Sequence, residues 1–536
     1  MEQTEWKEKY FELLKENSQL KQANKQLHSQ LQSYTEKTQK DQEIILSLKQ
    51  KIRNLKSQFR TSQLSDSSFE ECFQSLCSPY TSLHFSMQKY KCLHRQVAKE
   101  YTEVPLERNY SGTLTSPRMF EEFFIIGSEL SEVDKLKILF QFPSETNDQW
   151  KVLPTFAFPE GLKTSRISED SSVISRGSDR TGSSFVFTIK SSMSQEPFFF
   201  EVPNKDKELL YCCCVVQEEV LCSKSGEHYS QPRCYCLVSH CAAFQLHFQV
   251  LFKLLDLKNL YVEDSQLIND EMFGLLEEYA ENYNFSPSSN IFINLQSVDS
   301  IEYSFPFDLS NLDSQWFCPL MFSLLELSDF FWLLCAAMQE KSIVFVSQKL
   351  DRVTSCVLGL VSLMKPFKWS HVLTPILPNS LFDILEAPVP FIAGVKKPPD
   401  NLLSAYSHIV WVLLDEKSKI LKLGKVQKQV KVPYANNMLS YLKLPYSKFA
   451  GEECLVPNLE QKECTKRILG EICKYWKEIL GLLPPVLPDQ KVLDLDHINI
   501  VLMNKANPLD QNFIRKLIET QLFINKIEEL YKLQES

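Results

Sequence analysis

The fold class of this chain is decided by residues 338–378, which read MQEKSIVFVSQKLDRVTSCVLGLVSLMKPFKWSHVLTPILP. The run SIVFV predicts a buried strand, and the later run SHVLTPIL predicts a second one. Between them, residues 348–363 predict a helix, because apolar side chains recur on one face at Leu350, Val353, Val357, Leu360 and Met364. Two strands that bracket a helix pair in parallel through a right-handed crossover, which places the chain in the α/β class.

The turn that follows the first of these strands contains no glycine. It reads SQKLDRV, and we expect Ser347 to cap the helix with its side-chain oxygen. Enzymes that bind a nucleotide at such a turn use glycine-rich loops, whose backbone N–H groups approach the phosphates closely. The whole chain has 13 glycines and no G-x-G-x-x-G or H-E-x-x-H motif. The sequence therefore predicts an α/β unit without a phosphate-binding loop and a protein without a cofactor.

Length and composition are typical of a soluble protein with several domains. The 536 residues suffice for two to four domains, and apolar residues make up 44% of them. A net charge of −9 argues against binding of nucleic acid through a basic surface. No stretch is typical of a signal peptide or a transmembrane helix, so we expect a cytoplasmic protein whose 16 cysteines are reduced.

Residues 1–60 carry a seven-residue repeat typical of a coiled coil. Twelve of the sixteen a and d positions are apolar, and Asn17 and Asn24 at a positions favour a parallel dimer. The expected dimer core consists of Leu13, Asn17, Leu20, Asn24, Leu27, Leu48, Ile52 and Leu55. Two alternatives stay open: a single charged helix that docks on the rest of the protein, and a coil that pairs with a different protein.

Two stretches differ from their surroundings in composition. Residues 61–116 show no sustained period and are interpreted as a linker that contains one helix. Ten of the 22 residues from 163 to 184 are Ser or Thr, which predicts a flexible surface loop and a candidate for phosphorylation. The end of this loop has the spacing of a phosphate-binding loop, but Ser183 stands where a lysine is essential.

Apolar runs predict further elements on both sides of the central stretch. The predicted strands are EEFFIIG, LKILFQFP, SFVFTIK, LLYCCCVVQEEV, RCYCLVSH, PFIAGV and HIVWVLLD. Helical spacing predicts one helix in AAFQLHFQVLFKLLDL and another over residues 320–340. From about residue 432 onward the pattern is mostly helical.

The group most similar to a metal site comprises Cys212, Cys213, Cys214, Cys222, His228, Cys234, Cys236, His240 and Cys241. Structural zinc prefers paired ligands on a turn, whereas Cys234 and Cys236 fall within a predicted strand. Buried cysteine is also an ordinary core residue, so we predict no metal. The nine histidines accompany no nucleophile motif. The sequence thus points to a surface that holds another macromolecule rather than to an enzyme.

Three groups of motifs extend over most of the chain. The first group is FEEFFIIGSEL, KLKILFQFPS and LPTFAFPEGL; the second is the central stretch with its P-F-x-W-x-H and P-x-L-P motifs, followed by LEAPVPFIAGV; the third is QNFIRKLIETQLFINKIEEL. In these motifs the chain, from about residue 119 to residue 532, resembles the DENN-domain proteins, exchange factors for Rab-type small GTPases. It departs from the family's APxPYxxGV motif at Phe391, where a tyrosine is usual.

The resemblance implies a two-lobed architecture, with an N-terminal longin-like lobe and a central α/β lobe that has a helical C-terminal part, preceded by a long coiled-coil helix. We expect a coiled coil at 1–60, a linker at 61–116, an upstream DENN module at 117–222 with the Ser-rich loop 163–184, a central DENN module at 223–420 and a helical downstream DENN module at 421–536.

The resemblance also implies a guanine-nucleotide exchange factor that promotes GDP release from a Rab-family GTPase in membrane trafficking, without covalent chemistry of its own. Two alternatives stay open: an adaptor or scaffold that binds a small GTPase or another trafficking protein, and a GTPase-activating protein, which needs an arginine finger. The candidate GTPase contacts are Ser347, Lys349, Asp351, Arg352, Lys368, Trp369 and His371.

The family resemblance also implies a location in the cell. An exchange factor of this family acts in the cytoplasm, and peripheral association with vesicle or endosomal membranes fits its role. The parallel homodimer would double any membrane contact and so raise avidity. Residues 1–60 hold 12 Lys and Arg against 8 Asp and Glu, a weak basic excess that would favour an anionic membrane.

Overall fold

The computed structural model describes residues 118–535 apart from 131–134, 144–147, 168–182, 191–208, 223–226, 261–264, 283–285, 294–298, 400–405, 416–419, 422–428, 435, 450–455 and 485–494. The chain divides into two units, Met1–Ala98 and Lys99–Ser536, and all described residues belong to the second. The predicted coiled coil with its dimer core and the linker at 61–116 lie outside the described residues.

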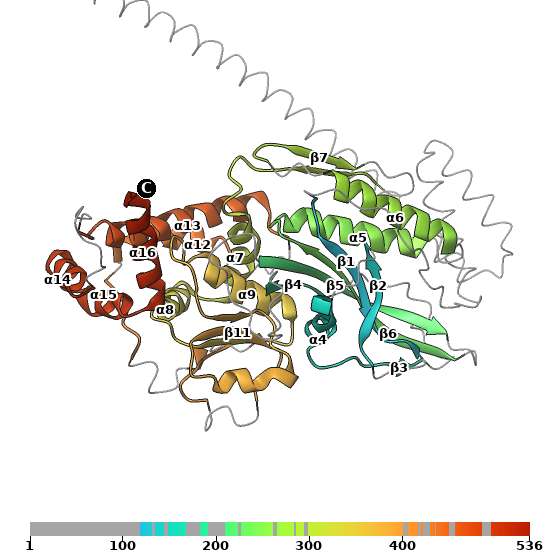
Figure 1. Ribbon diagram of the computed structural model, residues 1–536, viewed down its shortest axis with the longest axis horizontal. Helices are drawn as coiled ribbons and strands as arrows, with labels where there is room; N and C mark the ends of the chain where they lie inside the picture. Colours follow the sequence, from blue (N-terminus) through green and yellow to red (C-terminus); the bar gives the residue numbers. More distant parts are fainter. Residues whose placement is uncertain are drawn as a thin grey trace, which may run out of the picture. The chain divides into compact units, whose positions relative to one another are not determined.

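The first lobe is built on an antiparallel sheet of six strands (Figure 1). The strand order is β2-β1-β6-β5-β4, and the short β3 pairs with β6. The strands are β1 (Glu122–Gly127), β2 (Lys137–Phe142), β3 (Ser165–Arg166), β4 (Ser183–Lys190), β5 (Leu209–Cys222) and β6 (His228–Ser239). The five strands predicted by apolar runs in this part of the chain are thereby confirmed.

Both faces of this sheet are covered around β1, which explains why β1 is buried at all six positions rather than at alternate ones. Helices α5 (Phe244–Leu260) and α6 (Ser265–Glu281) pack on one face, to which Phe123 and Ile125 point. The 3₁₀ helix η2 (Asp148–Val152) and α4 (Leu153–Ala157) pack on the other face, against Phe124 and its neighbours (Figure 1). The predicted helix AAFQLHFQVLFKLLDL is α5.

The Ser-rich stretch 163–184 differs from the expected flexible loop at both of its ends. Ser165 pairs with Ser230 of β6, and Ser183 pairs with Val216 of β5, so strands replace the loop there. Hydroxyl side chains are compatible with sheet edges, where one side of the strand faces water. The middle of the stretch, 168–182, lies outside the described residues.

Strand β6 pairs with β1 and β5, so the module predicted to begin at residue 223 contributes a strand to the first sheet. A two-stranded hairpin, β7 (Asn290–Ile293) and β8 (Ile301–Ser304), follows α6. The module limits and the longin-like topology remain predictions.

The second lobe contains a five-stranded sheet in the order β10-β11-β9-β12-β13. Its strands are β9 (Ile343–Val346), β10 (Val372–Thr374), β11 (Phe391–Val395), β12 (Val410–Leu413) and β13 (Ile420–Leu421). The first four are parallel and β13 is antiparallel to β12, which confirms the α/β class and the parallel pairing. However, β10 pairs with β11 rather than with β9, because the crossover leaves room for a later strand between them.

Helix α9 (Leu350–Ser362) covers one face of this sheet, and the predicted apolar face is buried at all five positions. The approach is close: a Cβ on Gly394 of β11 would lie 2.1 Å from Val353 Cγ1. The 3₁₀ helix η3 (Asn379–Glu386) covers the other face through the buried Leu385. The prediction that Ser347 caps α9 is wrong, because α9 begins after Lys349 and has no side-chain cap. The Ser347 hydroxyl instead accepts the N–H of Lys349 at 3.1 Å.

The single helix predicted over residues 320–340 is two helices, α7 (Leu312–Leu324) and α8 (Leu327–Met338). Leu325 and Glu326 between them have extended backbone, with ψ of 147° and 150°. Apolar periodicity does not reveal this break, because residues on both sides of it are buried. Tyr446 donates a hydrogen bond of 2.9 Å to the Leu325 carbonyl and so satisfies a group that the break frees.

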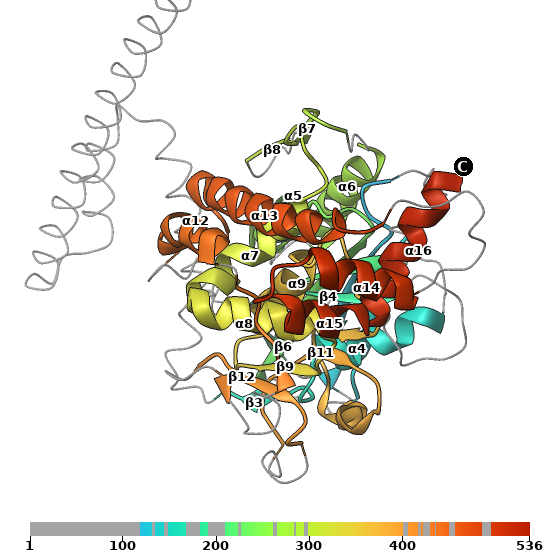
Figure 2. The same cartoon turned by 90° about the vertical axis from the view of Figure 1, so that its left-hand side faces the viewer.

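The C-terminal part is helical, as predicted, and packs on α7 and on the end of α9 (Figure 2). Its helices are α12 (Asn436–Ser447), α13 (Leu459–Leu480), α14 (Leu495–Lys505), α15 (Gln511–Ile518) and α16 (Gln521–Glu535). Asn458 and Gln461 form a capping box at the start of α13, and the buried Trp476 lies between Phe367 and Phe513. Among the described residues, no helix combines the length and the hydropathy of a membrane span.

Candidate functional site

The carboxyl ends of β9, β11 and β12 meet at one edge of the parallel sheet, the edge at which α/β proteins usually bind their ligands. Ser347 and Lys396 directly follow β9 and β11, and Asp415 lies two residues after the end of β12. Helix α9 begins at the same edge. The topology therefore gathers polar side chains from three separate parts of the sequence.

Asp415 organises this edge. Its Oδ1 accepts hydrogen bonds from Ser347 Oγ at 2.8 Å and from Arg352 Nη1 at 2.6 Å, and its Oδ2 accepts the N–H of Gln348 at 2.9 Å. Gln348 Nε2 also donates to the Lys396 carbonyl at 3.4 Å. The turn SQKLDRV is thus held to β11 and β12 by polar contacts.

Two carboxylates near the start of α9 have pKa values displaced in opposite directions. Partial burial alone raises the pKa of Asp415, but hydrogen bonds from Gln348, Ser347 and the Arg352 guanidinium bring it below its ordinary value. Burial raises the pKa of Asp351 above its ordinary value. Of these two carboxylates, Asp415 therefore stays charged down to the lower pH.

This edge borders the first lobe. The Glu160 carboxylate lies 2.9 Å from Lys396 Nζ and 3.5 Å from Lys397 Nζ, and the hydrogen bond from Lys396 holds the pKa of Glu160 below its ordinary value. Beside these ion pairs, Leu350 and Ile376 pack into the apolar cluster of the first sheet. We name the polar part the junction surface: Glu160, Gln348, Lys349, Arg352, Lys396, Lys397 and Asp415.

Of the seven candidate contacts predicted from the sequence, four lie at this edge. Lys349 is exposed, Arg352 and Asp351 are half-buried, and Ser347 is buried beneath the turn. Asp415, Lys396 and Glu160 were missed. The signal for Asp415 and Lys396 is their position within two residues of the ends of parallel strands, which becomes informative only once the strand order is known.

The other three candidates, Lys368, Trp369 and His371, lie at the opposite end of α9, before β10 begins. A helix of 13 residues separates the two groups by about 20 Å. Trp369 is 1% exposed, and its indole N–H donates to the Val372 carbonyl at 3.1 Å. The structure therefore does not bring the two groups together.

His371 connects the central lobe to the last helix. Its Nε2 lies 3.0 Å from Glu340 Oε1, and the same oxygen accepts the N–H of Leu522 in α16 at 2.8 Å. Asn525 of α16 donates to Ser370 Oγ at 2.8 Å. These contacts favour a structural role for His371, and of the three candidates at this end only Lys368 is exposed.

The cysteine group lies in the interior of the first lobe. Cys212, Cys214, Cys234 and Cys236 are fully buried on one face of β5 and β6. Burial raises the pKa of Cys212, Cys213 and Cys214, which favours the thiol over the thiolate that metals need. Burial also acts on Cys236, but hydrogen bonds from Cys212 and Cys214 lower its pKa to about 5. Over the described part of the chain, no three His, Cys, Asp or Glu side chains are placed to hold a metal ion together.

Residues 230–417 match the family model of the DENN (AEX-3) domain. The chain carries a DENN domain. The matched region extends from β6 to the end of β12 and includes all residues of the junction surface except Glu160. The family resemblance inferred from the sequence motifs is therefore confirmed.

Several DENN domain-containing proteins are similar to this chain at low identity. DENN domain-containing protein 2A of Mus musculus is 23% identical over 322 residues, which cover 59% of this chain and 27% of that protein. Protein 2D of Homo sapiens is 21% identical over 411 residues, covering 74% and 78%. Protein 1B of Mus musculus is 23% identical over 281 residues, covering 52% and 31%. The chain thus spans about a quarter of the relative 2A.

Proposed function

We propose that this protein is a guanine-nucleotide exchange factor for a Rab-type small GTPase and that the junction surface contacts the GTPase. DENN-domain proteins are known in general as regulators of Rab GTPases, and the match to that domain supports the proposal. The observation that carries it is the position of the junction surface, within the DENN domain, at the carboxyl edge of the parallel sheet and beside the first lobe.

Exchange requires a surface that binds the nucleotide-free GTPase more tightly than the GDP-bound form, since only differential affinity shifts such an equilibrium. A release rate about 10³-fold faster needs roughly 4 kcal/mol of preference in the transition state. An interface of about 1,600 Å² with a few strong contacts supplies that much. No group of this protein needs to take part in covalent chemistry.

The contacts of Asp415 suit the junction surface to this task. By holding Ser347, Gln348 and Arg352, Asp415 fixes the backbone of the turn before the partner arrives, so little ordering entropy is lost on binding. The side chains of Lys349 and Lys397 remain exposed. In this proposal they contact the acidic or polar groups of the GTPase that rearrange when GDP leaves.

The proposal is tested by release of a fluorescent GDP analogue from purified Rab proteins, with this protein in catalytic amounts. Lys349→Glu is expected to slow release about tenfold, because it reverses a charge on the proposed contact surface. Lys368→Glu, the same change at the other end of α9, serves as the matched control. If Lys368→Glu alone slows release, the contact lies elsewhere; if Rab proteins bind without faster release, the adaptor alternative replaces exchange.

Residues 1–60 have a proposed role of their own. We propose that they form a parallel dimer, which would bring two DENN bodies to a membrane; the heptad pattern supports this. The molecular mass of the protein with and without these residues tests the dimer. A monomeric mass for the full chain would exclude it.

A further inference from the structure

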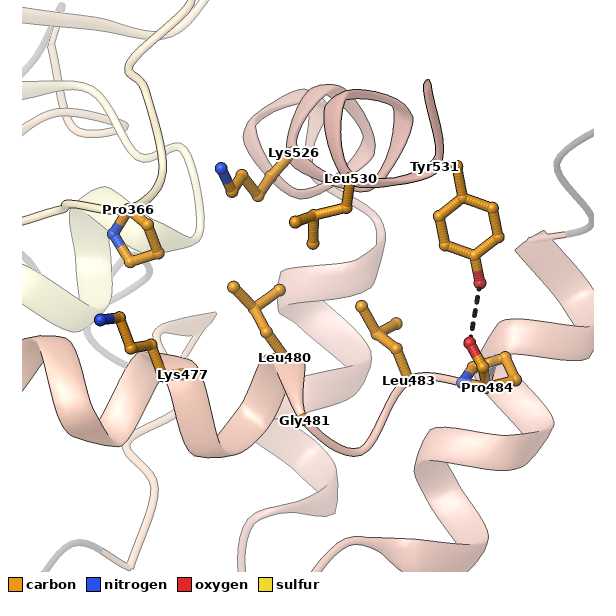
Figure 3. A pocket seen from close by; sticks show the side chains of 9 residues that line it. All are labelled: Pro366, Lys477, Leu480, Gly481, Leu483, Pro484, Lys526, Leu530 and Tyr531. Atoms are coloured by element: carbon orange, nitrogen blue, oxygen red, sulfur yellow. Dashed lines mark hydrogen bonds between the residues drawn. The ribbon is translucent and has the colours of Figure 1, made fainter. Parts of the chain in front are cut away.

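A cavity of about 620 Å³ opens between the end of α13 and α16, a volume in the range of ligand sites (Figure 3). One of its residues, Pro366, follows the carboxyl end of α9, whereas the junction surface adjoins the start of that helix. The cavity is therefore a separate site. Its walls include Lys477, Leu480, Leu483, Lys526, Leu530 and Tyr531.

The middle of the cavity is apolar. Leu480, Leu483 and Leu530 are half-buried and point toward one another in Figure 3. The Tyr531 hydroxyl donates a hydrogen bond of 3.3 Å to the Pro484 carbonyl and closes one end. The result is an apolar slot that is partly open to solvent.

The other end of the slot is cationic. Lys477 and Lys526 both lie at the Pro366 end, and none of the nine residues that line the cavity is acidic. Lys526 Nζ lies 3.0 Å from Glu529, a residue outside the lining. No carboxylate among the described residues lies within ion-pair distance of Lys477 Nζ. A smaller hollow of about 510 Å³ shares Lys477 and adds Lys474 and Glu478.

Interactions within its own helix explain the position of each lysine separately. They do not explain why Lys477 and Lys526 lie at the same end of the cavity. A lysine in the last turn of α13 interacts favourably with the helix dipole, and Lys526 forms an i,i+3 pair with Glu529. Neither interaction requires both ammonium groups to lie at the same end of an apolar slot. The whole chain carries a net charge of −9, so two lysines beside an apolar slot form a local site that attracts an acidic partner.

We propose that this cavity docks a short acidic peptide segment of a partner protein. One large apolar side chain of the segment enters between Leu480, Leu483 and Leu530, and neighbouring carboxylates pair with Lys477 and Lys526. Charge complementarity selects this occupant. The site is independent of nucleotide exchange and would serve to place the protein next to its partner.

The test selects ligands from a displayed library of random linear peptides against the full-length protein. Enriched peptides, labelled with fluorescein, are then measured by fluorescence polarisation. We expect enriched sequences with acidic residues beside a Leu, Phe or Met, and affinity that falls about tenfold or more in the double variant Lys477→Glu/Lys526→Glu. Leu530→Ser, a change of a half-buried side chain, is expected to weaken binding without unfolding the protein.

The matched control is Lys466→Glu, which makes the same charge change on α13 at an exposed residue outside the cavity lining. The Lys466→Glu variant should bind the peptides as tightly as the unchanged protein does. High salt should weaken peptide binding by both proteins. Peptides whose binding survives Lys477→Glu/Lys526→Glu, or a library that yields none, would overturn the proposal. So would vesicles of phosphatidylserine that bind through these lysines when no peptide does, since the ligand would then be a membrane.

Discussion

The Asp415 carboxylate lies 2.6 Å from the Arg352 guanidinium, so the end of β12 is tied to the first turn of α9. The same carboxylate accepts the N–H of Gln348, just before the helix begins. In nucleotide-binding α/β proteins, backbone N–H groups at this position bind phosphate. Here an internal anion already uses one of them, which gives a physical reason for a turn that needs no glycine.

Asp415→Asn tests whether this anion organises the junction surface. The variant loses the charge that attracts Arg352, and we expect a stability loss of about 1 kcal/mol or less, since Asp415 is 40% exposed and solvent screens the pair. The effect on GDP release should be larger than the effect on stability, because the turn loses its fixed geometry. Thermal unfolding and the GDP-release assay measure the two; equal activity in both proteins would show that the turn does not depend on Asp415.

The contribution of Asp415 should depend on pH with a definite sign. Its pKa in the folded chain is lower than its ordinary value, so the stabilisation is fully present above the pKa of the unfolded chain, about 3.9. It is lost as pH falls through the folded pKa. We therefore expect the difference in Tm between the unchanged protein and Asp415→Asn to be constant near neutral pH and to shrink below about pH 4. A difference that grows on acidification would contradict this assignment.

Gly394→Ala should destabilise the second lobe strongly. The new Cβ would lie 2.1 Å from Val353 Cγ1 and 2.3 Å from the Pro375 carbonyl oxygen, and the latter belongs to the backbone and cannot move alone. We expect a loss of about 3 kcal/mol, at the upper end for overpacking. Gly274→Ala in α6, where no atom apart from the adjoining helix backbone lies within 4 Å of the new Cβ, is the matched control and should stabilise by up to about 1 kcal/mol. Denaturant unfolding of the two variants distinguishes packing from a general intolerance of alanine.

Glu340 is expected to hold α16 against the central lobe. Glu340→Ala removes the acceptor of the Leu522 N–H and the partner of His371, which should cost about 1–2 kcal/mol and speed hydrogen exchange at the start of α16. Glu340 has a φ of 51°, a conformation that favours glycine. Glu340→Gly should therefore lose about 1 kcal/mol less than Glu340→Ala. If hydrogen exchange of the Leu522 N–H is unchanged in both variants, Glu340 does not hold α16 against the central lobe.

The amino-acid sequence by itself was sufficient to predict the α/β class, most of the strands and the buried face of α9. These features follow from the spacing of apolar residues along a single element, which local burial imposes whatever the partner is. The DENN-like motifs, too, are local runs of residues. For the same reason the sequence did not reveal the break at Leu325, since apolar residues continue on both sides of it.

Tertiary structure alone decided which of the candidate residues share a surface. Arg352 and Asp415 are 63 positions apart and meet only because β12 lies beside β9 in the sheet. Lys368 and His371, which are near Arg352 in sequence, are carried to the other end of α9. Sequence patterns record which side of an element is buried, whereas strand order, and with it the composition of a site, depends on the packing of segments that are distant in the chain.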